Sequence, residues 1–117
     1  MPPNTHVYTD ERDLTIVAGT SVSSSYISVI TATAGLIMMP AAWTAASIAF
    51  YALGMHGDLH LLYNGGALVQ VNAPAVNLCY PIPIPVFQCL RVYLFSQNAV
   101  GVAVVQAQDR VITVQLK

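Results

Sequence analysis

Charged residues are nearly absent from the middle of this chain, and this constrains its fold more than any other feature of the sequence. No Asp, Glu, Lys or Arg lies between Asp13 and Asp58, and none lies between Asp58 and Arg91. Charged residues make up 8% of the chain, whereas an average soluble domain carries about 25%. A free monomer with so few charges is poorly protected against association. We therefore expect partners to cover much of its surface.

The longest uncharged stretch, residues 26–53, raises the question of a membrane span, because its length would cross a bilayer. Pro40 interrupts it, Ser and Thr are frequent in it, and no Lys or Arg lies near either end to anchor it. Its β-branched residues suit strands better than a helix. We therefore predict no transmembrane segment, and the N-terminus lacks the basic-then-apolar pattern of a secretory signal.

Alternation of apolar and polar residues predicts many short strands. The clearest are residues 47–53, 89–96 and 110–117, others are expected at 13–18, 21–30, 35–40, 59–63 and 66–71, and residues 99–106 are expected to form one more strand or an edge loop. Asn64-Gly65 is a strong hairpin signal, because a type I′ turn needs two residues that tolerate positive φ.

Short strands with regularly spaced turns are typical of β-sandwiches, and 117 residues form one domain by size. We predict an all-β fold, an antiparallel β-sandwich of jelly-roll type, over residues 13–117. Residues 1–12 contain two prolines and end in three charged residues. We expect them to form an extended N-terminal arm that a neighbouring subunit orders.

A proline-rich segment, residues 80–88, lies between the two cysteines. Because Pro cannot donate to a ladder, this segment is predicted to be extended and PPII-like at the surface. A disulfide between Cys79 and Cys89 is conceivable, and two free thiols are the alternative that a reducing cytosol favours. The helix-friendly run at residues 41–46 is too short for a stable helix, and we expect a turn or a single helical turn there.

Residues suited to catalysis or metal binding are few. His56, Asp58 and His60 form the one candidate ligand cluster, since two imidazoles and a carboxylate can bind a transition metal. Hairpin tips favour the same polar residues, and we prefer that interpretation. No serine has a nucleophile-elbow context, no carboxylate pair suits glycoside hydrolysis, and no glycine loop suits phosphate. We therefore predict no enzymatic activity, no cofactor and no bound metal.

Nucleic-acid binding also lacks a basis in the sequence. The net charge is −1 and the four basic residues are scattered, so no basic patch can neutralise phosphates. Partners are therefore expected to be proteins, which favour aromatic and Arg side chains at their contacts. Arg91 stands in an otherwise apolar strand and must face solvent, a partner or Asp109. The residues expected at protein interfaces are Arg91, Tyr80, Pro83, Phe87, Trp43, His56 and His60.

Three segments carry a recognisable pattern: MPAAWTAASIAF at 39–50, LRVYLFS at 90–96 and QAQDRVIT at 106–113. The first is followed by a Gly/Asp turn, and Leu62-Tyr63 then precedes a glycine hairpin. This pattern resembles small proteins encoded among the virion-assembly genes of tailed phages and prophages, and the resemblance extends from residue 14 to residue 117. The turn at 53–58 and the proline-rich insert depart from the family pattern, so partner identity does not carry over.

The resemblance implies a component of the virion, assembled in the host cytoplasm. The function we favour is a capsid decoration or cement protein that bridges subunits of the major capsid protein through apolar β surfaces. We expect a homo-oligomer, and the phage context suggests a trimer. The alternative is a head-fibre, knob or tail accessory module that binds a host receptor or another virion protein. The uncharged character runs along the strands as well as the loop tips, which favours decoration.

Overall fold

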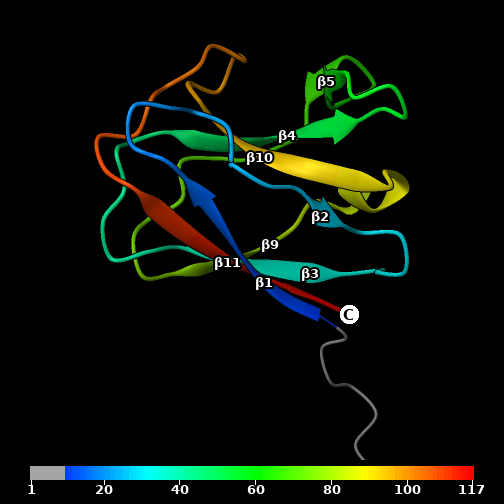
Figure 1. The fold of residues 1–117 in the computed structure, drawn as a ribbon, viewed down its shortest axis with the longest axis horizontal. Coiled ribbons are helices and arrows are strands. Elements are labelled where there is room, and N and C mark those ends of the chain that lie inside the picture. Colours follow the sequence, from blue (N-terminus) through cyan, green and yellow to red (C-terminus); the bar gives the residue numbers. More distant parts are fainter. Residues whose placement is uncertain (1–9) are drawn as a thin grey trace, which may run out of the picture.

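Two antiparallel β-sheets make up most of the computed structural model, which describes residues 10–117 (Figure 1). The first sheet consists, in spatial order, of β1 (Asp10–Ile16), β11 (Arg110–Leu116), β3 (Gly35–Met38) and β9 (Cys79–Pro81). The second consists of β2 (Ile27–Ser28), β10 (Arg91–Gln97), β4 (Ser47–Leu53) and β5 (Leu59–Leu61), and β8 (Gln70–Val71) also pairs with β4. A small hairpin joins β6 (Tyr63–Asn64) to β7 (Ala67–Leu68). The prediction of an all-β fold of antiparallel strands is confirmed.

One hydrophobic core contains side chains from both sheets. In β11 the buried residues are Ile112, Val114 and Leu116, and in β10 Val92 and Leu94 belong to the same core. Successive side chains of a strand point to opposite faces, so the residues between them lie on the outer faces of the sheets. The alternation in the sequence therefore located the long strands β4, β10 and β11 within one or two residues of their ends.

The first strand begins earlier than the sequence suggests. Residues 10–12, expected in the N-terminal arm, belong to β1, where Asp10 pairs with Leu116 and Arg12 pairs with Val114. Their charged side chains do not prevent strand formation, because charges are common on an edge strand, where they discourage pairing with other chains. The remaining arm, residues 1–9, lies outside the described residues, and the prediction that a neighbour orders it stays a prediction.

The expected strand at 21–30 forms a regular ladder only at β2. Before it, the chain runs irregularly beside β10, with Val22 bridging to Phe95. The buried Ser23 hydroxyl accepts a bond from the Leu94 N–H at 3.0 Å and donates to the Ser25 carbonyl at 2.8 Å. A side chain therefore replaces part of the backbone ladder here. Residues 99–106 form an edge loop, since their one bridge joins Ala103 to Gln97.

The hairpin predicted at Asn64-Gly65 is present, and its turn lies one residue further along. Tyr63 pairs with Leu68 and Asn64 with Ala67, which leaves Gly65 and Gly66 as the two turn residues. Both have positive φ, 61° and 85°, as a type I′ turn requires. Asn64 is therefore the last paired residue of β6.

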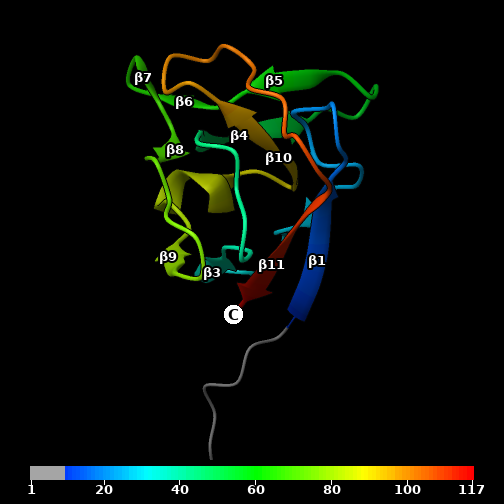
Figure 2. The same ribbon diagram turned by 90° about the vertical axis from the view of Figure 1, so that its left-hand side faces the viewer.

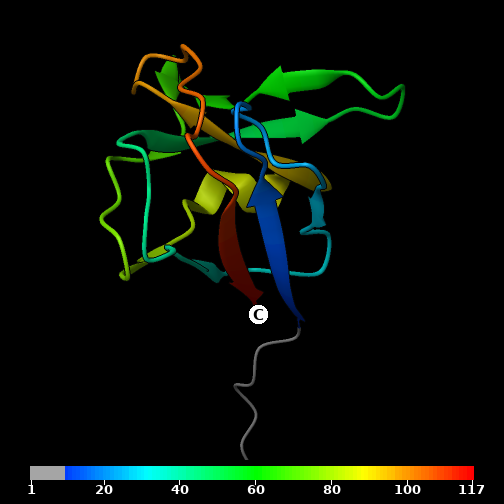
Figure 3. The same cartoon turned by 60° about the vertical axis from the view of Figure 1, so that its left-hand side comes forward.

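The proline-rich segment differs from the expected surface PPII structure. Pro81 is in β9, an edge strand that tolerates proline, and Ile84–Gln88 form one turn of 3-10 helix, η1. Figure 3 shows this turn, in yellow, between the two sheets. Ile82 and Val86 are buried, so apolar side chains at alternate positions with the prolines draw the segment onto the core. Residues 41–46 are irregular and contain no helical turn.

Both cysteines are free thiols in the structure. Residues 10–117 contain no helix with the length and hydropathy needed to span a membrane.

Candidate functional site

The β4–β5 hairpin holds the histidines that the sequence singled out. The His60 Nε2 atom hydrogen-bonds to the Asp58 carboxylate, and His56 is exposed in the turn. This bond from His60, together with a backbone hydrogen bond, holds the pKa of Asp58 below its usual value. Residues 10–117 contain no cluster of three or more side chains suited to hold a metal. The structure thus brings together Asp58 and His60, and the arrangement is that of an exposed side-chain hydrogen bond beside a turn.

Three of the predicted interface aromatics contribute to the fold itself. Trp43, Tyr80 and Phe87 are half-buried and pack against the core. The Trp43 indole donates to the Ala46 carbonyl at 3.1 Å, and the Tyr80 hydroxyl accepts from the Ala75 N–H at 2.8 Å. Their polar groups are therefore already bonded within the chain, which leaves only part of each ring for a partner.

Pro83 is half-buried and immediately precedes η1, so it shapes the start of that turn.

Arg91 lies on the outer face of the second sheet, within an aromatic group. Its guanidinium carbon lies 5.5 Å from the centre of the Tyr26 ring, and Tyr26 meets Tyr93 edge-on at 5.8 Å. On the same face, the rings of Tyr51 and Phe95 are 4.8 Å apart. The neighbour of the Arg91 guanidinium is therefore the Tyr26 ring, and Asp109, which the sequence analysis considered, bonds elsewhere.

Asp109 bonds to the backbone and not to Arg91, which the sequence analysis considered as its partner. Its carboxylate accepts a hydrogen bond from the Ala18 N–H at 2.8 Å. This bond ties the start of β11 to the loop after β1.

The loop after β10, residues 98–105, displays several apolar side chains to solvent. Val100, Val102 and Val105 are 71%, 58% and 56% exposed, and the Tyr63 ring is half-exposed nearby. A Cβ built on Gly101 would lie 3.3 Å from a Leu61 methyl and 3.8 Å from the Tyr63 hydroxyl. The loop (orange in Figure 2) therefore sits against β5 and β6 at one end of the molecule, and we call these exposed residues the apolar tip.

A buried amide fixes the conformation of this loop. The Gln97 side chain, fully buried, accepts the Gly101 N–H at 2.9 Å and donates to the Gln70 side chain at 2.8 Å. The Asn98 carboxamide oxygen accepts the N–H groups of Val100 and Val102 at 3.1 and 3.2 Å. The loop is thus tied to the sheet by side chains from within and beside it.

A second buried amide, Gln106, connects the three segments whose pattern resembles phage proteins. Its Nε2 donates to the Thr44 carbonyl at 3.1 Å and to the Ser96 hydroxyl at 2.9 Å. Its Oε1 accepts from the Thr44 N–H at 2.9 Å and from Arg110 Nε at 3.2 Å. The sequence did not identify this cluster, although each of the three patterned segments contributes to it. The pattern therefore marks a structural junction of the fold.

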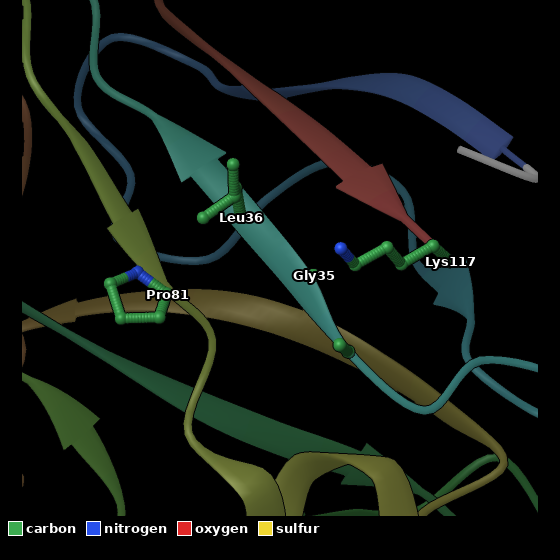
Figure 4. A pocket seen from close by; sticks show the side chains of 5 residues that line it. Gly35, Leu36, Pro81 and Lys117 are labelled. Carbon is green, nitrogen blue, oxygen red and sulfur yellow. The ribbon is translucent and has the colours of Figure 1, made fainter. Parts of the chain in front are cut away.

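A shallow pocket at the edge of the first sheet is lined by Ala34, Gly35, Leu36, Pro81 and Lys117 (Figure 4). Its volume of about 200 Å³ is below the range of about 300–1,000 Å³ typical of small-molecule sites. The walls are mainly apolar, and Lys117 contributes an amino group. This pocket lacks the convergent polar groups that orient a bound small molecule.

Comparison with known proteins gives one informative likeness. No protein-family model matches the chain, and no curated protein matches it. The crystal structure of the SPBc2 prophage-derived protein YomS superposes with a TM-score of 0.53 at 16% sequence identity, covering 97% of this chain and all of that one. The chain therefore shares its fold with a prophage-derived protein.

Proposed function

We propose that this chain is a non-enzymatic structural protein of a phage particle, and that it decorates the capsid by bridging subunits of the major capsid protein. The structural neighbour is prophage-derived, which is compatible with a phage origin. The proposed location is the virion, and the proposed partners are the major capsid protein and further copies of this chain.

One observation supports the proposal most: many large apolar side chains are exposed in the described part of the chain, and charged residues are few. The large apolar residues exposed among residues 10–117 outnumber the four basic and five acidic residues of the whole sequence. They include Ile30, Met55 and Leu90 in turns and bends and Ile84 in η1, as well as the apolar tip. Exposed apolar side chains that gather in one place, as in the apolar tip, are typical of contacts with other proteins. A decoration protein has such contacts on more than one side.

The strand order supports a jelly-roll fold, which is common among capsid proteins. When the eight main strands are counted along the chain, β9, β10 and β11 are the sixth, seventh and eighth. The first sheet then has the order 1-8-3-6 and the second the order 2-7-4-5. We infer from this interleaved order that the two sheets form a jelly-roll sandwich.

The test is binding of the purified protein to undecorated capsid shells of the phage that encodes it. Co-sedimentation should saturate at a fixed ratio of protein to capsid subunit, and electron microscopy should show added density at regular positions. Absence of binding to shells, with the protein instead located on tails or at a single vertex, would contradict decoration and favour the accessory role. A trimer is expected at each position, and the density would show its symmetry directly.

A further inference from the structure

Arg91 is the one arginine whose guanidinium has no hydrogen-bond acceptor within residues 10–117. The guanidinium of Arg12 bonds to a neighbouring carboxylate, and that of Arg110 bonds to a side-chain amide oxygen and a hydroxyl. Arg91 has only its contact with the Tyr26 ring, although the residue is half-buried. A charge held partly away from water is stabilised by pairing. The N–H donors of Arg91 are therefore suited to an acceptor from outside the chain.

We propose that Arg91, with Tyr26 and Tyr93 beside it, is the site at which this chain binds a carboxylate of a partner protein. The inference rests on the proposed function, because it assigns this contact to an Asp or Glu side chain of the major capsid protein. Arg and Tyr are residue types enriched at protein contacts, and they are frequent among the residues that carry most of the binding energy.

The surrounding residues hold the Arg91 side chain in place. Arg91 is the first residue of β10 and pairs with Ser28 of β2, so the sheet fixes its backbone. Its guanidinium carbon lies 5.5 Å from the centre of the Tyr26 ring, within the range of a cation–π contact. The Tyr93 ring meets that of Tyr26 edge-on at 5.8 Å. A guanidinium positioned in this way loses less entropy when its planar fork pairs with a carboxylate.

The acidic groups of this chain are already bonded within it, which favours a different protein as the partner. Each of its five carboxylates has a hydrogen-bond partner in the same chain: Arg12 for Asp10, Gln115 for Glu11, Thr113 for Asp13, His60 for Asp58 and the Ala18 N–H for Asp109. A second copy would therefore offer Arg91 only carboxylates that already have a donor. A different protein with an unpaired Asp or Glu is the better match.

The site fits a single carboxylate better than a sugar or a nucleic acid. The planes of the Tyr26 and Tyr93 rings are 70° apart, so the two rings form no flat platform for a sugar ring or a base. Arg91 is also the one Asp, Glu, Lys or Arg in the strands of the second sheet. A nucleic acid needs several cations along its phosphates, whereas one guanidinium can pair with both oxygens of one carboxylate.

The first experiment compares R91Q with R12Q in co-sedimentation with undecorated capsid shells. R91Q should bind at least about tenfold more weakly, because it leaves the partner's carboxylate in the contact without its cation. R12Q is the matched control: it removes the same charge from an exposed pair on β1, and its binding should stay within about twofold of the wild type. R91K keeps the charge without the planar fork, so its affinity should fall several-fold. Wild-type binding should weaken as salt is raised, and binding of R91Q should depend less on salt.

These outcomes separate the inference from the proposed function. Shell binding by R91Q that equals wild-type binding overturns the carboxylate site and leaves decoration intact. An R12Q variant that loses as much affinity as R91Q also overturns it, because the effect would then come from net charge.

A second measurement tests the site without shells. The full chain is titrated with N-acetylglutamate N-methylamide to about 100 mM, a range that reveals weak binding, while NMR follows the Nε–H signals of the arginines. The carboxylate should shift the Arg91 signal saturably and more than the signals of Arg12 and Arg110, which already have acceptors. The neutral glutamine analogue should produce no such shift. A selective shift without binding to shells would contradict decoration and support the site. Absence of a selective shift overturns the site, whether or not the chain binds to shells.

Discussion

The side-chain amide of Gln106 and the backbone of Thr44 bond to each other in both directions, across 62 residues of sequence. Gln106 is fully buried, and its backbone also bonds to Gly19 and Thr20. One side chain therefore joins the loop before β4, the end of β10 and the start of β11. Such a junction stabilises the fold only while all of its groups are paired.

Replacing Gln106 with Ala should destabilise the protein strongly. The substitution leaves the Thr44 N–H and carbonyl and the Ser96 hydroxyl without their partner, and buried unpaired groups of this kind cost about 2–3 kcal/mol in total. Urea unfolding gives the change in free energy. Gln108→Ala is the control, because Gln108 is exposed, and its effect should stay within about 0.5 kcal/mol. Equal effects of the two substitutions would show that the junction contributes little.

The hairpin turn at Gly65-Gly66 should tolerate a side chain at one position and not at the other. Gly66→Ala should lower the free energy of unfolding by about 1–2 kcal/mol, because φ is 85° there and a Cβ is strained in that conformation. Gly65→Asn should be nearly neutral, since Asn is the preferred first residue of a type I′ turn. A Cβ at either position meets no neighbouring atom, so backbone conformation alone decides the difference. Equal stability of the two variants would contradict the turn assignment.

The Asp58–His60 pair should be visible in the titration of the Asp58 carboxylate. The bond from His60 lowers the pKa of Asp58 in the folded state. Its contribution to stability is therefore present above the ordinary Asp pKa, about 3.9, and is lost as pH falls through the lower folded value. In His60→Ala the pKa of Asp58 should rise, as followed by the carboxyl carbon shift in NMR. His56→Ala should leave it unchanged, and a rise in both variants would point to a general effect of the turn.

The two thiols should differ in reactivity. Cys79 is exposed, whereas burial raises the pKa of the half-buried Cys89 and so reduces its thiolate fraction at neutral pH. A disulfide-exchange reagent should therefore modify Cys79 several-fold faster. The rates are assigned with the single variants Cys79→Ser and Cys89→Ser. A folded protein in which neither thiol reacts before reduction would instead indicate that the two cysteines are paired.

Strands could be predicted from the sequence where one of their faces is buried, because apolar residues then recur at every second position. In β10 and β11 every second residue enters the core, so the alternation in the sequence marks both strands. The start of β1 shows no alternation of apolar and polar residues, because residues 10–13 are all charged. On the outer face, the Glu11 carboxylate accepts a hydrogen bond from Gln115, and that of Asp13 accepts one from Thr113. The pairing of β1 with β11 depends on residues about a hundred positions away, which local patterns do not encode.

The candidate site was less predictable than the strands. Trp43, Tyr80 and Phe87 were selected as large aromatics, and composition does not distinguish a ring that packs on the core from one that meets a partner. The residues 99–106 were noticed only as an apolar, β-branched stretch. Their exposure depends on Gln97, whose role appears only when the sheet brings Gln70 beside it. The contacts of Gln106 with Thr44 and Ser96 were not predicted, because they join residues that are far apart in the sequence.

The pairing of β1 with β11 has a consequence for synthesis on the ribosome. β1 is an edge strand whose one neighbour in the sheet is β11, and Asp13 lies opposite Thr113. At about 5–20 residues per second, a newly made β1 waits roughly 5–20 s for its partner. During that interval the side chains of Leu14 and Ile16, which are buried in the finished protein, remain accessible to chaperones and to other nascent chains. The first sheet therefore cannot close until β11 has been made, and until then β1 is open to pairing with other chains.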